Sequence, residues 1–256
     1  MESISPDALI RLLDQHCNAN PGAMIATDAD GTLWSGDVGI DTFGHLMRVR
    51  GVLADAAEAL RGDAQEAGVG PAGDVNDTAL ALFHACERGA WSEKRTYEMM
   101  AWAFAGWEVR RVGDFAREAL QAANLADRLH RELIAVLSWA TRAGILVRVV
   151  SASPLPVVQQ AVEWVGIDPA NVIAATPALR DGCVLAHMGA PIPYGPGKVH
   201  ALRDADPDFR IAAAFGDNVF DLEMLQSSAI PIAVRPKTRL LERVGEVPGV
   251  RLLAQA

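Results

Sequence analysis

Short runs of apolar residues recur along this chain, and each is bounded by polar or turn-forming residues. The runs that predict strands cover residues 23–27, 145–150, 172–175, 211–215 and 230–234, with a short extra strand at 184–188. Runs of this length without polar alternation are typical of parallel strands that are buried on both faces. Apolar residues recur at helical spacing in residues 6–18, 155–165 and 222–226, which predicts helices there. Strands that alternate with helices predict an α/β fold with a parallel sheet.

The segment from about residue 35 to residue 140 has a different pattern. Its apolar residues recur at helical spacing, as at Leu80, Phe83 and Cys86, and long strand signals are scarce. We therefore predict two domains. Residues 1–34 and 144–256 form a Rossmann-like core around the parallel sheet, and residues 35–143 form an inserted all-helical cap.

Composition and charge narrow the range of partners. The net charge of −9 does not favour nucleic acid, which needs a basic face. No apolar run approaches 18 residues, so we expect no membrane span. The N-terminal segment lacks the basic start and apolar run of a signal peptide, and we expect a cytoplasmic protein. The three cysteines show no CxxC pairing, the six histidines show no ligand spacing, and no pattern predicts an oligomeric state.

Polar signals follow the predicted strands at the sheet edge where α/β proteins bind ligands. Asp28 and Asp30 come directly after the first run, in the sequence Asp-Ala-Asp-Gly-Thr-Leu. Two residues apart on an extended segment, their carboxylates point to the same side. Ser151 follows the run at 145–150, Lys198 lies in a Gly-Pro-Gly-Lys segment, and the sequence Gly-Asp-Asn-Val-Phe-Asp at 216–221 follows the run at 211–215. We interpret these signals together as one catalytic site.

The oxygen-rich set matches Mg²⁺, which prefers oxygen ligands and keeps several waters. Asp28, Asp217 and the backbone carbonyl of Asp30 are candidate ligands. Asp221 is a candidate for orienting a metal-bound water or Lys198. The metal, Lys198 and the hydroxyl of Ser151 would then surround a phosphoryl group. A carboxylate nucleophile would divide hydrolysis of a phosphate ester into two steps.

These motifs resemble those of the haloacid dehalogenase superfamily. The helical insert and the stretch Thr176–Lys198, with its Asp181-Gly182 turn, resemble the phosphoserine phosphatase-like subfamily, which has a helical cap. The resemblance implies the following roles: Asp28 as nucleophile and metal ligand, Asp30 as general acid and base and as metal ligand, Thr32, Ser151 and Lys198 at the phosphate, Asp217 as a further metal ligand, and Asn218 and Asp221 in support. It also implies Mg²⁺ as cofactor.

The sequence departs from phosphoserine phosphatases in the last motif, which commonly reads GDGxND. Asn218 and Phe220 stand where that pattern has Gly and Asn. We therefore expect a small phosphate ester other than phosphoserine. Trp34, Asp37 and Arg95 are the candidates for touching the substrate. The tryptophans of the insert have two interpretations, core packing or an aromatic wall for a cationic head group such as choline.

The predicted function is a Mg²⁺-dependent phosphomonoesterase. Two alternatives remain at the level of sequence. One is a phosphotransferase that passes the phosphoryl group to an acceptor other than water. The other is a non-catalytic binding module on the same scaffold, which the complete set of acids disfavours.

Overall fold

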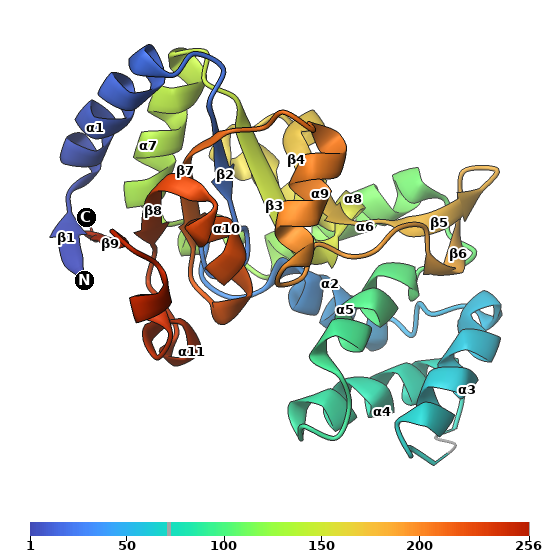
Figure 1. The fold of residues 1–256 in the computed structure, drawn as a ribbon. Helices are drawn as coiled ribbons and strands as arrows, with labels where there is room; N and C mark the ends of the chain where they lie inside the picture. Colours follow the sequence, from blue (N-terminus) through green and yellow to red (C-terminus); the bar gives the residue numbers. More distant parts are fainter. Residues whose placement is uncertain (71–72, 256) are drawn as a thin grey trace.

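The computed structural model describes residues 1–70 and 73–255, and its main feature is a seven-stranded sheet. All its strand pairs are parallel, in the order β1-β9-β8-β7-β2-β3-β4. The strands are β1 (Glu2–Ile4), β2 (Met24–Thr27), β3 (Val147–Pro154), β4 (Val172–Ala175), β7 (Ile211–Gly216), β8 (Ser228–Ala233) and β9 (Arg251–Leu253). The predicted α/β fold with a parallel sheet is confirmed, and Figure 1 shows the helices on both sides of it.

Successive residues of the central strands pack on opposite faces of the sheet, as the pleat requires. In β2, Ile25 packs in the cluster that contains helices α1, α7 and α8, whereas Met24 and Ala26 pack with α9 and α10. Both faces are covered by apolar side chains, which explains why the strands read as continuous apolar runs. These helices are α1 (Pro6–Ala19), α7 (Arg131–Arg142), α8 (Leu155–Val162), α9 (Gly197–Ala205) and α10 (Leu222–Gln226), with the short α11 (Thr238–Leu241) near α10.

The two three-residue strands, β1 and β9, pair with each other at one edge of the sheet. They place the first and last parts of the chain side by side (Figure 1). The sequence analysis did not predict either strand, because three residues are too few to show a period.

A second group of helices forms its own hydrophobic cluster beside the sheet. Its members are α2 (Val38–Arg48), α3 (Ala57–Glu66), α4 (Val75–Glu87), α5 (Glu93–Trp102) and α6 (Val109–Ala122). Trp102, Phe104 and Trp107 are buried in this cluster. Strands β5 (Pro177–Arg180) and β6 (Cys183–Met188) form a hairpin that packs against this helical cluster through Val184. Asp181 and Gly182 both have positive φ, as a two-residue turn between antiparallel strands requires.

Helices α6 and α7 connect this helical group to the sheet. Val112, near the start of α6, packs in the helical cluster, whereas Ala116 and Leu120 pack in the cluster of the sheet. Helix α7 packs entirely with the sheet through side chains such as Leu133 and Val136. Thus α7, which lies inside the range 35–143, belongs to the sheet by its packing. The division into two domains at these residues stays a prediction.

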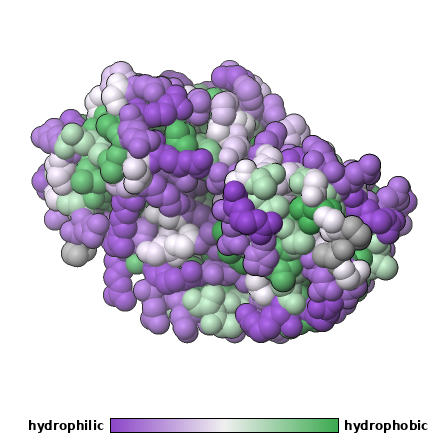
Figure 2. All heavy atoms as spheres, turned by 90° about the horizontal axis from the view of Figure 1, so that it is seen from below, coloured by the Kyte–Doolittle hydropathy of each residue, from purple (hydrophilic) through white to green (hydrophobic). Residues whose placement is uncertain are grey.

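The surface in Figure 2 is mostly hydrophilic, and its hydrophobic residues lie in separate small patches. Among the residues that the structure describes, no helix has the length and hydrophobicity to cross a bilayer.

Candidate active site

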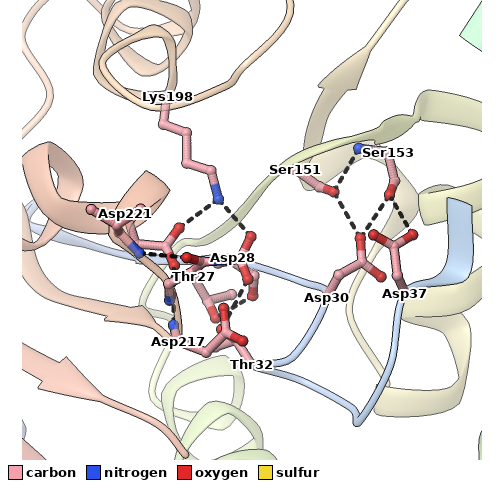
Figure 3. Close-up of polar contacts among 12 residues, drawn as sticks. Thr27, Asp28, Asp30, Thr32, Asp37, Ser151, Ser153, Lys198, Asp217 and Asp221 are labelled. Carbon is pink, nitrogen blue, oxygen red and sulfur yellow. Dashed lines mark hydrogen bonds and ion pairs between the residues drawn. The ribbon is translucent and has the colours of Figure 1, made fainter. Parts of the chain in front are cut away.

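The predicted catalytic residues lie together because adjacent strands end at the same edge of the sheet. Asp28 directly follows β2 and Asp217 directly follows β7, and these strands pair with Thr27 opposite Phe215. Ser151 lies in β3, the neighbour of β2 on the other side. Lys198 comes from the first turn of α9, and in Figure 3 its side chain points between Asp28 and Asp221.

Asp28 is buried, and both its carboxylate oxygens are held. The Nζ atom of Lys198 donates to Oδ1 at 2.5 Å, and the hydroxyl of Thr32 donates to Oδ2 at 2.9 Å. Burial raises the pKa of Asp28 well above its usual range, Asp221 and Asp217 add to this, and Lys198 opposes it. Among these influences, the ion pair with Lys198 is the one that favours the charged carboxylate, which is the form that a nucleophile needs.

Asp221 positions Lys198 and closes the loop after β7. Its Oδ1 accepts from Lys198 Nζ at 2.6 Å, and its Oδ2 accepts the backbone amides of Asp217 and Asn218, each at 3.0 Å. Burial alone would lower the pKa of Lys198, but Asp221 and Asp28 outweigh it and raise the pKa above its ordinary value. Lys198 is therefore a permanent buried cation.

Asp217 is buried, and one of its carboxylate oxygens meets a single cation. Lys237 Nζ lies 2.8 Å from Oδ2 as an ion pair, and no other donor among the described residues reaches this oxygen. Burial, assisted by Asp221, raises the pKa of Asp217 to about 6, and Lys237 opposes the rise. Gly31, at φ +84°, passes so close that a Cβ there would lie 2.0 Å from Oδ2. A glycine is therefore required beside this oxygen.

The donor set fits a divalent cation that prefers oxygen. Carboxylate oxygens of Asp28, Asp217 and Asp221 lie within 4.8 Å of one another. The three carboxylates and the two ammonium groups of Lys198 and Lys237 leave one negative charge unbalanced when all are ionised. Asp221 accepts three hydrogen bonds, whereas Asp28 accepts two and Asp217 Oδ2 meets only Lys237. Asp28 and Asp217 therefore keep more capacity than Asp221 to bind such a cation.

Asp30 points away from this cluster, toward β3 and the helical group (Figure 3). Its Oδ1 accepts from Trp34 Nε1 at 3.0 Å and from the Val38 amide at 2.8 Å. Its Oδ2 accepts the hydroxyls of Ser151 at 3.3 Å and Ser153 at 2.7 Å. Two fixed donors thus anchor one oxygen, and two rotatable hydroxyls hold the other.

A cavity of about 470 Å³ opens onto these groups. Its lining comprises the expected Asp28, Asp30, Asp37, Ser151, Lys198, Asp217, Asn218 and Asp221 and also Gly36, Ile40, Asp41, Glu93, Tyr97, Ala152, Ser153, Tyr194, Phe220 and Lys237. The volume suits a small molecule. Helix α5 of the helical group supplies Glu93 and Tyr97, so the cavity lies between that group and the sheet edge.

Three of the expected residues do not reach the cavity. Thr32 is buried and orients Asp28 through its hydroxyl. Trp34 is fully buried and anchors Asp30, so its ring packs in the core and exposes no surface to a substrate. Arg95 is drawn to another part of the helical group, because the carboxylates of Asp63 and Glu66 bind its guanidinium.

Several cavity residues were missed by the sequence analysis. Ser153 follows Ser151 at the two-residue spacing that points both side chains to one side of β3, and this spacing was a usable signal. Lys237 lies in the segment between the end of β8 and the start of α11, so its position at the sheet edge was a weaker signal. Tyr97 and Tyr194 carried no local signal, because their approach depends on how the helical group lies over the sheet.

The chain matches the family model described as haloacid dehalogenase-like hydrolase over residues 25–226. A search of curated protein sequences finds no match. Among solved structures, a protein of unknown function from Bordetella pertussis Tohama I is similar, with 21% identity, TM-score 0.68, and coverage of 91% of this chain and 98% of that one. A functionally unknown protein from Anaerococcus prevotii has 14% identity, TM-score 0.69, and coverage of 96% and 91%.

A probable phosphoserine phosphatase from Vibrio cholerae is also similar, with 16% identity, TM-score 0.55, and coverage of 91% of this chain and 61% of that one. At these identities the solved structures show a shared fold. The family match covers the segment that contains Asp28, Lys198 and Asp217.

Proposed function

Because this chain belongs to the haloacid dehalogenase-like hydrolases, we propose that it is a Mg²⁺-dependent phosphomonoesterase acting through a phosphorylated Asp28. The observation that carries the proposal is the environment of Asp28. This carboxylate is buried at the floor of a small-molecule cavity, paired with Lys198 and adjacent to Asp217. A structural carboxylate would gain little from a position that opens onto a cavity.

In the first step, an oxygen of Asp28 attacks the phosphorus atom as the bond from phosphorus to the leaving oxygen breaks. Lys198 and the hydroxyl of Ser151 offset the charge on the phosphoryl oxygens. Asp30 enters this step protonated at Oδ2, gives that proton to the leaving alcohol oxygen and becomes a carboxylate. To do so, its Oδ2 exchanges a hydroxyl of Ser151 or Ser153 for the substrate, while Trp34 and Val38 keep Oδ1 in place.

In the second step, water attacks the phosphorus atom and the bond to the Asp28 oxygen breaks. Asp30, now ionised, takes the proton of the attacking water, and inorganic phosphate leaves. The ester and one water molecule thus give one alcohol and one phosphate. Bound Mg²⁺, held by Asp28, Asp217 and the backbone carbonyl of Asp30, would neutralise phosphoryl charge.

The test is hydrolysis of a panel of phosphate esters with added Mg²⁺, measured as phosphate release. We expect turnover that EDTA abolishes and Mg²⁺ restores, with Ca²⁺ a poor substitute because it prefers more ligands and looser geometry. Asp28→Asn should abolish turnover with the fold intact by circular dichroism, because it removes the attacking charge. Substantial turnover by Asp28→Asn would rule out this assignment. Added alcohols would reveal any transfer to an acceptor other than water.

A further inference from the structure

The segment between β8 and α11 brings to the cavity a cation that the proposed mechanism does not use. Lys237, in this segment, lines the cavity and contacts Asp217 in two ways. Its backbone amide donates to the carbonyl oxygen of Asp217 at 2.7 Å, and its Nζ lies 2.8 Å from Asp217 Oδ2. Backbone and side chain together therefore hold Lys237 against a carboxylate that is a proposed ligand of Mg²⁺.

The conformation of this segment is strained and is fixed by its neighbours. Arg235 has φ +44°, a left-handed value that costs energy in residues other than glycine, and the next residue, Pro236, favours an extended residue before it. The Nε of Arg235 donates at 2.9 Å to the carboxylate of Glu132, which is buried in α7. Strain of this kind persists only where the surrounding structure imposes it. The approach of Lys237 to Asp217 is therefore imposed by the fold.

Oδ2 of Asp217 has room for one cation. The loop after β2 crowds this oxygen, because a Cβ at Gly31 would lie 2.0 Å from it. Lys237 Nζ lies 2.8 Å from the same oxygen, and Mg²⁺ binds carboxylate oxygens at about 2.1 Å. An ammonium group and a divalent ion at such distances from one buried oxygen repel each other strongly. Binding of Mg²⁺ to Oδ2 therefore requires the ammonium group of Lys237 to leave.

The two lysines of the site differ in their freedom to leave. Lys198 Nζ binds Asp28 and Asp221 at once, and its side chain is only 4% exposed. The side chain of Lys237, which pairs with Asp217, is 54% exposed. Lys237 is therefore the cation that can exchange with a metal, because its ammonium group can turn into the cavity and be hydrated there.

We propose, resting on the proposed phosphatase function, that Lys237 is a built-in competitor of Mg²⁺ for Asp217. Its ammonium group neutralises this buried carboxylate when the metal leaves, and it moves into the cavity when the metal binds. Lys237 thereby weakens the binding of Mg²⁺ and spares the protein an unpaired buried charge between binding events. It also sets the concentration of Mg²⁺ at which the site fills.

The first test is calorimetric titration of Mg²⁺ into protein that has been treated with EDTA and desalted, with no substrate present. We expect Lys237→Gln to bind Mg²⁺ about tenfold or more tightly than the wild type, because the substitution removes both the competitor and its charge. Arg239→Gln is the matched control, since it removes a positive charge nearby in the chain that pairs with Glu93. Its Kd should stay within about threefold of the wild type, because exposed charges are screened. A Kd of Lys237→Gln that equals or exceeds the wild-type Kd would overturn this inference.

The second test follows Lys237 in the wild-type protein and so does not depend on the folding of a variant. The lysines of the chain are Lys94, Lys198 and Lys237. A short pulse of acetic anhydride at pH 8, analysed by mass spectrometry, should label Lys237 severalfold more in Mg²⁺ than in EDTA, because the metal frees its amine from Asp217. Labelling of Lys94, half-exposed on α5, is the reference. Asp217→Asn should label Lys237 equally in both solutions.

The two tests separate this inference from the proposed function. Labelling of Lys237 that Mg²⁺ leaves unchanged in the wild type would contradict the exchange of the two cations. If Mg²⁺ binds and supports turnover while either test gives its contrary result, this inference fails alone. If calorimetry detects no binding of Mg²⁺ to the wild type or to Lys237→Gln, the proposed function fails as well.

Discussion

At the scale of single residues, Asp30 is held unlike the other acids of the site. It accepts two fixed donors on one oxygen and two serine hydroxyls on the other. The fixed donors keep the carboxylate in position, while the serine hydroxyls can give way to another hydrogen-bonding partner. Such a carboxylate can transfer a proton without changing its position. Asparagine at this position would keep the size of the side chain but would carry no proton.

We therefore expect Asp30→Asn to lower kcat by about 10²–10⁴-fold, the usual cost of a positioned proton-transfer group. Both ester cleavage and breakdown of the phosphorylated Asp28 should slow, because the same group serves both steps. Rapid-quench measurement of the phosphorylated protein and of released phosphate separates the two steps. A variant within a few-fold of the wild type would leave Asp30 with a structural role only.

Asp37 gives a pH dependence of stability whose sign follows from its raised pKa. The pKa is about 7 in the folded protein and about 3.9 in an unfolded chain. Between pH 4 and pH 7, Asp37 is protonated in the folded protein, where burial and the nearby Asp30 disfavour its charge, and ionised in the unfolded chain. The free energy of unfolding therefore falls as the pH rises from about 4 to about 7. The whole shift corresponds to about 4 kcal/mol, but Asp37 is partly exposed at the cavity wall, so we expect about 1–2 kcal/mol.

Asp37→Asn removes this ionisation and keeps the oxygen that caps α2. The variant should therefore gain stability relative to the wild type when the pH is raised from 5 to 8. Urea unfolding of both proteins in EDTA at several pH values measures the difference. Parallel stability curves would contradict the shift.

At the scale of elements, the loop after β2 depends on a glycine for its approach to the loop after β7. A Cβ at Gly31 would collide with the carboxylate of Asp217, and φ at Gly31 is +84°. Gly44 is a contrast, because it is exposed in the middle of α2 with open space where a Cβ would lie.

We expect Gly31→Ala to destabilise the protein by about 1–3 kcal/mol, since both backbone strain and the displaced Asp217 oppose it. Gly44→Ala should stabilise it by about 0.5–1 kcal/mol, because alanine loses less entropy in a helix. Thermal unfolding measures the change in stability that each glycine-to-alanine substitution causes. Equal changes in the two variants would show that the loops after β2 and β7 do not require a glycine at position 31.

The sequence predicted the central strands well, because strands covered on both faces must be apolar along their whole length. It also predicted that Asp28, Ser151 and Asp217 meet, because parallel strands present their carboxyl ends at one edge. Lys198, also expected at the site, reaches them from the first turn of α9. Such arguments need only the order of strands and helices. The short edge strands β1 and β9 escaped prediction because backbone pairing, rather than a hydrophobic pattern, defines them.

The residues of the helical group were harder to place. Glu93 and Tyr97 are four apart and so share a face of α5, but spacing does not say what that face meets. Arg95 was expected at the substrate, and acids from α3 bind it elsewhere. Trp34 was expected there too, and its position beside the catalytic loop places it underneath Asp30. These outcomes depend on long-range packing.

At the scale of the whole molecule, the negative charge gathered at the sheet edge predicts a link between Mg²⁺ and stability. A ligand that binds only the folded state stabilises it by about 2.7 kcal/mol at 100 times its Kd. Mg²⁺ should therefore raise the Tm of the wild type by a few degrees. In Asp217→Asn the rise should be much smaller, because a proposed ligand has lost its charge. An equal rise in both proteins would place the binding of Mg²⁺ elsewhere.

The position of β2 between β3 and β7 has a consequence for the time at which the enzyme can form. On a ribosome, β2 is made early, whereas β7 emerges after the whole helical group and both strands of the hairpin. Until then, Asp28 lacks Asp217 beside it, and one edge of a strand that is buried along its whole length stays unpaired. Such an edge invites pairing with other chains. Translation that stops before β7 should therefore yield aggregating fragments and no partly active ones.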